Sequence, residues 1–139
     1  MLRVRGVPIS TTNTGIDLGI DTAAGVRRCT AKQPTRIADG RQRSAKAKLL
    51  ARLNSKAARL AITGVKPADQ FGMKVTGASV TARAQCRANF AKATGKMTSG
   101  ACTTTVIRTS FRKGRYKHTP PDPETNLQSE QVNEWIRIW

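Results

Sequence analysis

Acidic residues are scarce in this sequence. Of its 139 residues, 8 are Asp or Glu and 25 are Lys or Arg, which gives a formal net charge of +17 at pH 7. Such an excess excludes a surface balanced by ion pairs and is typical of proteins that bind polyphosphates or anionic surfaces. Residues 119–139 carry a net charge of −3, whereas residues 1–118 carry +20. The acidic end therefore has a different role, or it folds back on the basic part.

Aromatic residues, histidine and paired cysteines are scarce as well. Aromatics make up 4% of the chain, which leaves little material for base stacking. The single histidine, His118, and the cysteines Cys29, Cys86 and Cys102 have no CxxC or zinc-finger spacing. These absences exclude a disulfide framework and argue against sequence-specific base recognition. We expect a reduced intracellular protein without metal or cofactor, located in the nucleus rather than the cytoplasm and not secreted.

Long hydrophobic runs are also missing. No window approaches the roughly 18 apolar residues of a membrane span, so we expect no membrane partner. Leu, Ile, Val and Phe together account for 26 of the 139 residues, a low share for so charged a chain. The sequence therefore predicts a small core, one that a partner could complete.

Hydrophobic periodicity predicts a mainly α fold with a small N-terminal β-hairpin, a basic helical bundle, a Pro-rich linker and a C-terminal amphipathic helix. In the hairpin, residues 1–21, Arg3–Ile9 and the alternating Gly15–Asp21 pair across the turn STTNTG. The other regions are a basic helical nucleic-acid-binding region over residues 22–95, an extended segment and linker over 96–126, and the C-terminal helix over 127–139.

Three helices are expected within the basic region. The first follows Thr22 as its cap, is kinked by Pro34 and ends at Gly40. The second covers Arg41–Ile62, and the third covers Val80–Thr94 with Ser79 as its N-cap and with Ala82, Cys86, Phe90 and Ala93 on one face.

The second helix combines an apolar stripe with a basic line. Leu49, Leu53 and Leu60 share one side and are expected to face the core. Arg41, Lys48, Arg52 and Arg59 share another side, about 80 to 100° away. An ordinary solvated face mixes both signs of charge, whereas this one has almost no acids, which favours contact with a phosphate backbone. The expected nucleic-acid-binding residues are Arg27, Arg28, Lys32, Arg36, Arg41, Arg43, Lys48, Arg52, Lys56 and Arg59.

The C-terminal segment carries an apolar helix face. Val132, Trp135, Ile136 and Trp139 stand at positions i, i+3, i+4 and i+7. Such a face packs either on the protein's own helices or on a partner, and the spacing alone does not decide between them.

An enzyme is the least supported class. Asp17 and Asp21 lie four residues apart on one expected strand and could act as a metal pair, but carboxylates flanked by glycine are more often turn or surface residues. No nucleophile and base can be assigned, so we expect no catalytic residues.

The order of several short motifs resembles the region just after the palm in reverse transcriptases of LINE-like, non-LTR retroelements. The motifs are DLGID (Asp17–Asp21), a basic helix pair, TGVKPADQFG (Thr63–Gly72) with its Phe-Gly pair, and VTGAS (Val75–Ser79). This resemblance implies a thumb-like fragment whose segment Arg27–Arg59 grips the backbone of an RNA, DNA or hybrid duplex, with the remainder of a reverse transcriptase as a further partner. No aromatic-x-Asp-Asp motif is present, so the resemblance implies no polymerase activity of its own. The alternative is a small basic structural RNA-binding protein of ribosomal or packaging type, which would share the charge and the thin core.

Overall fold

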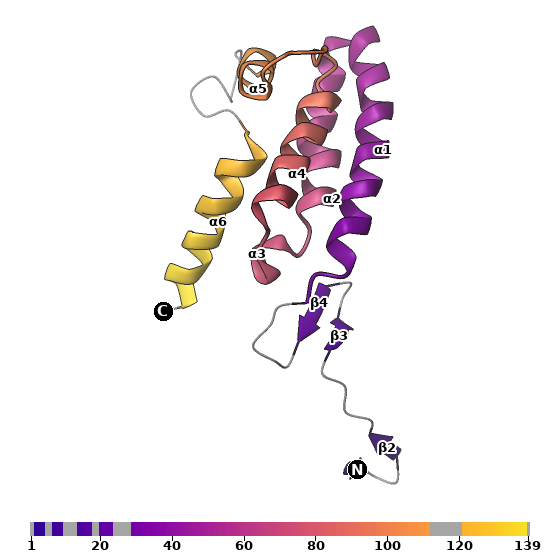
Figure 1. Ribbon diagram of the computed structural model, residues 1–139, viewed down its shortest axis with the longest axis vertical. Coiled ribbons are helices and arrows are strands. Elements are labelled where there is room, and N and C mark those ends of the chain that lie inside the picture. Colours follow the sequence, from indigo (N-terminus) through magenta and orange to yellow (C-terminus); the bar gives the residue numbers. More distant parts are fainter. Residues whose placement is uncertain are drawn as a thin grey trace.

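The computed structural model describes residues 2–4, 7–9, 14–17, 20–23, 29–111 and 121–138, and these residues are mainly helical, as predicted. Figure 1 shows α1, α2 and α4 side by side, with α5 near one end of this group and α6 along its flank. The elements are β1 (Leu2–Val4), β2 (Val7–Ile9), β3 (Thr14–Asp17), β4 (Ile20–Ala23), α1 (Lys32–Leu53), the 3₁₀ helix η1 (Ser55–Arg59), the π-helix η2 (Ala61–Val65), α2 (Lys66–Gln70), α3 (Met73–Thr76), α4 (Val80–Ala93), α5 (Thr103–Ser110) and α6 (Pro123–Ile138).

The predicted N-terminal hairpin is not supported. Instead of Arg3–Ile9 pairing with Gly15–Asp21, β1 pairs with β2 and β3 pairs with β4, both antiparallel. Pairing between neighbouring segments closes shorter loops and so costs less chain entropy. In the second pair Asp17 is opposite Ile20 and Asp21 is opposite Ile16, so the two aspartates stand on different strands rather than four apart on one.

Helix α1 differs from the prediction at both ends. It begins at Lys32, which places Pro34 in the first turn, where a backbone N–H has no partner within the helix. Gly40 lies inside this helix and does not end it. The helix ends at Leu53 because Asn54 adopts an extended backbone and its side chain accepts a hydrogen bond from the backbone N–H of Lys56. The predicted continuous helix Arg41–Ile62 is therefore wrong beyond Leu53.

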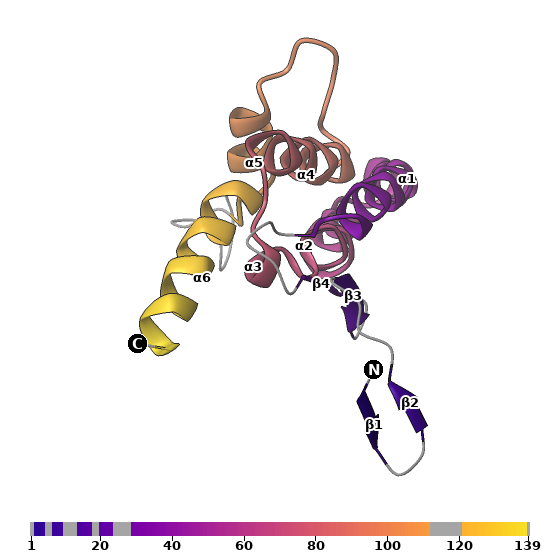
Figure 2. The same cartoon turned by 60° about the horizontal axis from the view of Figure 1, so that its bottom comes forward.

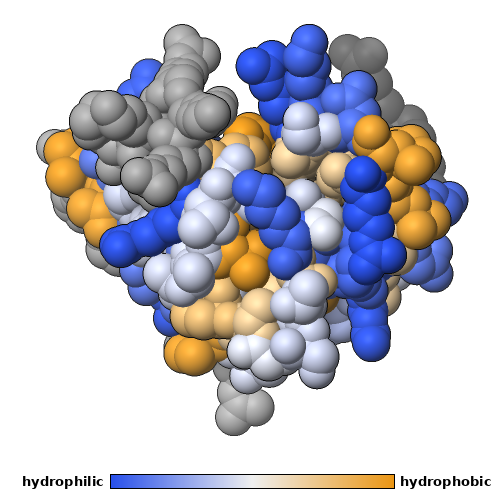
Figure 3. Space-filling view, turned by 90° about the horizontal axis from the view of Figure 1, so that it is seen from above, coloured by the Kyte–Doolittle hydropathy of each residue, from blue (hydrophilic) through white to orange (hydrophobic). Residues whose placement is uncertain are grey.

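Helix α1 packs on its neighbours through a face of mostly small residues and not through its leucines. Its buried residues are Ile37, Gly40, Ser44 and Ala47, which repeat at helical spacing. Gly40 faces Asp69 of α2, whereas Ala47 belongs to the core cluster that includes Phe90 and Ala91 of α4. The expected core leucines are exposed: Leu49 by 61%, Leu53 by 87% and Leu60 by 40%. Figure 3, which views the end of the molecule where α1 finishes, shows exposed hydrophobic side chains among hydrophilic ones.

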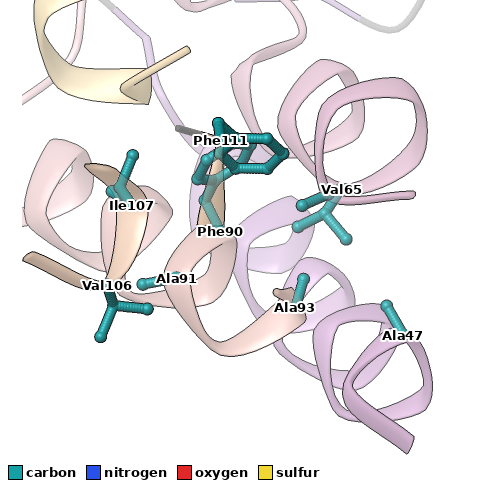
Figure 4. Packing of buried hydrophobic residues seen from close by; sticks show 9 residues of the cluster. Ala47, Val65, Phe90, Ala91, Ala93, Val106, Ile107 and Phe111 are labelled. Atoms are coloured by element: carbon teal, nitrogen blue, oxygen red, sulfur yellow. The ribbon is translucent and has the colours of Figure 1, made fainter. Parts of the chain in front are cut away.

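The main core lies between α4, α5 and η2. The rings of Phe90 and Phe111 have centroids 5.6 Å apart, and Figure 4 shows them together, with Val65 to one side and Ile107 to the other.

Helix α4 confirms its prediction, because the Ser79 hydroxyl accepts a hydrogen bond from the backbone N–H of Ala82 at 3.1 Å. The extended conformation predicted for Thr103–Phe111 is wrong, since α5 forms there to bury Val106 and Ile107. Most of the predicted Pro-rich linker, residues 112–120, lies outside the described residues.

The acidic C-terminal part folds back on the basic helices. Helix α6 begins at Pro123, earlier than predicted, and runs past α3 and α4 (Figure 2). It buries Leu127, while Val132 and Ile136 of the predicted apolar face are 58% and 70% exposed. The structure does not describe the side chain of Trp135 or any part of Trp139, so the full face remains a prediction.

A polar cluster lies where α1, α2 and α4 meet. Asp69 of α2 is 1% exposed, and its Oδ2 accepts a hydrogen bond of 3.0 Å from Nδ2 of Asn89, which also donates to the Ile37 carbonyl. The other oxygen, Oδ1, has no hydrogen-bond partner. Burial raises the pKa of Asp69 from 3.8 to about 6, although the hydrogen bond from Asn89 and the charge of Arg43 oppose the shift.

Because the pKa of Asp69 is raised, we expect the free energy of unfolding to fall as the pH rises. Between pH 3.8 and about 6 the folded chain keeps a proton on Asp69 that the unfolded chain has released. The free energy of unfolding therefore decreases as pH rises through this window and is constant above it. We expect Asp69→Asn, which cannot ionise, to be more stable than the wild type by about 2 to 3 kcal/mol at pH 7.5 and equally stable near pH 4. Urea unfolding of both proteins at the two pH values measures this, and a difference independent of pH would contradict it.

Candidate nucleic-acid interface

A shallow groove runs between α1 and α4. It consists of two depressions of about 530 and 540 Å³ that share Ala88 and Lys92 of α4. Arg41 of α1 lines the first depression, and Lys48 and Arg52 of α1 line the second. Because α1 and α4 approach through small residues, long side chains on their margins form the walls. The groove therefore carries basic side chains contributed by both helices.

Among the described residues, no acidic side chain lines the groove. Among the described residues at its surface, the remaining polar ones are Gln85, Asn89, Thr98 and Ser99. Arg41 and Arg52 are exposed, whereas Lys48 and Lys92 are half-buried. Guanidinium, ammonium, hydroxyl and amide groups are the donors that proteins place against phosphate oxygens. The groove has the chemistry of a site for a polyanion.

Three acids near the C-terminus form ion pairs away from the groove. Within the described residues, Arg87 of α4 contacts Asp122 at 2.7 Å and Glu124 at 3.3 Å, and Lys74 contacts Glu130 at 2.9 Å. All three acids belong to α6 or immediately precede it. None of these ion pairs involves a basic residue of the groove. Among the described residues, therefore, no ion pair neutralises the basic side chains of the α1–α4 groove.

The structure divides the residues that the sequence analysis had grouped. Arg41, Lys48 and Arg52 line the groove as their spacing predicts, but Arg59 lies in η1, after the break at Asn54, and does not continue their line. Arg36 and Arg43 line a different depression beside α2. The other expected binding residues are Lys32 and Lys56, which are exposed outside the groove, and Arg27 and Arg28, which lie outside the described residues.

Two exposed features of the molecule, Lys92 in the groove and Phe71 on another side of α1, escaped the sequence analysis. Lys92 was not singled out because it lies on another helix, although Gln85, Ala88 and Lys92 repeat at intervals of three and four along one side of α4. Phe71 was noted only as part of a Phe-Gly pair, and no spacing indicated that its ring is half exposed beside Arg36.

Comparisons with protein-family models, curated proteins and solved structures give no match for this chain. In the part of the chain that the structure describes, no three potential metal ligands gather in one place. Nor does any described helix combine the length and the apolar character that crossing a bilayer requires.

Proposed function

We propose that this protein binds nucleic acid through its phosphate backbone, in the groove between α1 and α4. The observation that carries the proposal is the convergence of Arg41, Lys48, Arg52 and Lys92 on one groove whose described lining contains no acid. Neutralising phosphates with such side chains releases counterions, and this gives affinity without sequence preference. The net charge of +17 adds long-range attraction for any polyanion.

Binding by the backbone fits the thumb-like role that the motif resemblance implies. In a fragment of a reverse transcriptase, the same groove would hold a template-primer duplex beside the missing palm. The short motifs alone support that narrower role, and we keep it as part of the proposal. The wider role requires only phosphate contacts and holds for RNA, DNA or their hybrid.

Charge reversal in the groove tests the proposal. We expect the variant Arg41→Glu, Lys48→Glu, Arg52→Glu and Lys92→Glu to bind an RNA–DNA hybrid about 100-fold less tightly at low salt, because each contact contributes one released counterion. The slope of log affinity against log salt concentration should fall by about 3 to 4. Fluorescence anisotropy across a salt series, with circular dichroism of the same samples, measures both quantities.

A matched control separates the groove from total charge. Lys46, Lys56, Arg59 and Arg108 are exposed and line neither depression of the groove. Reversing these four changes the net charge by the same amount, so it should weaken binding only through the long-range field, by about 10-fold or less. Equal losses in the two quadruple variants would reject the groove as the binding site.

A further inference from the structure

A second surface on the opposite flank of α1 carries an exposed aromatic ring. Of the three phenylalanines, Phe90 and Phe111 are buried in the core, whereas Phe71 is 50% exposed. Phe71 follows the last residue of α2 and precedes Gly72, whose φ of 79° turns the chain into α3. A large apolar side chain that is half exposed at such a turn contributes little to the core, so its position has to be explained by other contacts.

Arg36 holds this ring in place. Its guanidinium carbon lies 4.6 Å from the ring centroid, and its Nη1 donates a hydrogen bond of 2.8 Å to the Phe71 carbonyl. The hydrogen bond and the cation–π contact together fix the ring against the side of α1. One face of the ring is therefore covered by the guanidinium of Arg36.

The ring separates two depressions. The first, about 490 Å³, is lined by Arg36 and Arg43 with Asp39, and the second, about 440 Å³, lies between Phe71, α3 and η2. Arg36 lines only the first depression, so it does not cover the part of the Phe71 ring that borders the second depression. Ile62, Pro67 and Val75 give that second depression apolar walls.

Two lysines, Lys66 and Lys74, and one acid, Glu130, border the second depression. Lys74 is paired with Glu130, but Lys66 makes no ion pair among the described residues. Burial, above all, lowers the pKa of Lys66; the charge of Lys74 adds to that shift, and the charges of Glu130 and Asp122 oppose it. A phosphate beside the ammonium group would oppose it further. An apolar recess with a ring on one wall and a lysine beside it fits a planar base joined to a phosphate.

We propose that Phe71 is a stacking platform for one unpaired base of a single-stranded nucleic acid, with Lys66 beside the adjoining phosphate. This inference rests on the proposed function and narrows its substrate, because a base within a duplex cannot reach the ring. Stacking on an aromatic side chain tolerates any base, in agreement with a sequence that contains no motif for base-specific recognition. The protein should then prefer single strands over duplexes of equal charge.

Fluorescence of 2-aminopurine tests the stacking directly. We expect the fluorescence of a single-stranded oligonucleotide that contains this base to be quenched when wild-type protein binds it. Phe71→Leu should not quench the fluorescence and should bind the oligonucleotide about 10-fold less tightly. Leucine keeps an apolar side chain at a half-exposed position, so the fold should persist. Phe71→Tyr should retain both signals. Val75→Ala is the matched control, since Val75 borders the same depression and is 77% exposed but has no ring.

The outcomes separate this inference from the proposed function. Affinity for duplex should be unchanged in Phe71→Leu and lost in the quadruple groove variant. If Phe71→Leu keeps its quenching and its affinity for single strands while the groove variant loses binding, the stacking site is wrong and the groove stands. 2-Aminopurine riboside monophosphate probes the ring without the groove, so quenching by wild type and not by Phe71→Leu would support stacking even if the groove variant bound normally. If wild-type protein quenches the fluorescence of neither probe, the proposed stacking site is wrong.

Discussion

Replacing Gly40 by alanine is expected to lower the free energy of unfolding by about 3 kcal/mol or more, or to abolish cooperative folding. A Cβ on Gly40 would overlap Oδ1 and Cγ of Asp69 and lie 2.7 Å from Oδ2. The carboxylate has little room to move away, because it is buried and held by Asn89. Helix propensity alone predicts the opposite, a gain of about 1 kcal/mol for alanine inside a helix. Urea unfolding followed by circular dichroism measures the result.

Gly64→Ala is the matched control for this prediction. Gly64 lies in η2, and a Cβ there would meet no atom within 4 Å. It should be neutral or stabilising by up to about 1 kcal/mol. The double variant Gly40→Ala, Asp69→Ala should be more stable than Gly40→Ala alone, because shortening Asp69 removes the overlap. If Gly40→Ala matched wild type in stability, the close contact between α1 and α2 would not constrain the fold.

A comparison of Gly40 with Gly95 shows where prediction from the sequence succeeds and where it fails. Helix α4 was predicted correctly because all its signals are local: Ser79 caps it, the buried residues repeat at helical spacing, and Gly95 follows with a φ of 78°. Gly40 gives the same local signal as Gly95, yet it lies within α1. Its small size serves a neighbour from α2, and that contact is not encoded in the residues around it.

Burial on α1 shows the same limit. The sequence offers a leucine stripe and a stripe of small residues on one helix, and hydrophobicity alone favours the leucines. The structure instead buries smaller residues of this helix: Gly40 packs against Asp69 of α2, Ser44 and Ala47 are buried as well, and Leu53 remains exposed. Likewise, α5 forms despite β-branched residues because Val106 and Ile107 then fill the core beside Phe90.

The candidate groove was predictable in part. Spacing placed Arg41, Lys48 and Arg52 on one side of a helix, and that inference needs only helical geometry. Lys92 joins them because α4 lies next to α1, a fact of tertiary packing. The charge asymmetry indicated that the acidic end could fold back. The ion pairs show that Arg87 and Lys74 are the basic residues that it contacts.

Arg87→Ala is expected to lower the free energy of unfolding by about 3 kcal/mol, because its removal leaves a poorly solvated carboxylate without a counter-charge. Arg87 joins three elements: it donates to Asp122 Oδ2 from both Nε and Nη2, to the Thr104 hydroxyl of α5 from Nη2, and it lies 3.3 Å from Glu124 of α6. The side chain of Asp122 is 12% exposed, so water cannot replace the lost guanidinium. Thermal and urea unfolding of the variant measure the loss.

Lys74→Ala provides the matched control, since it removes the ion pair between Lys74 and Glu130 of α6. The side chains of Lys74 and Glu130 are 50% and 38% exposed, and a pair so open to solvent contributes at most about 1 kcal/mol. A large loss for Arg87→Ala with a small loss for Lys74→Ala would show that α6 is held through Arg87. Equal, small losses would mean that Leu127 and the hydrogen bond from Gln70 to the Pro123 carbonyl suffice to hold it. The distinction bears on binding, because an α6 that detaches would free its acids to compete with phosphate for the basic groove.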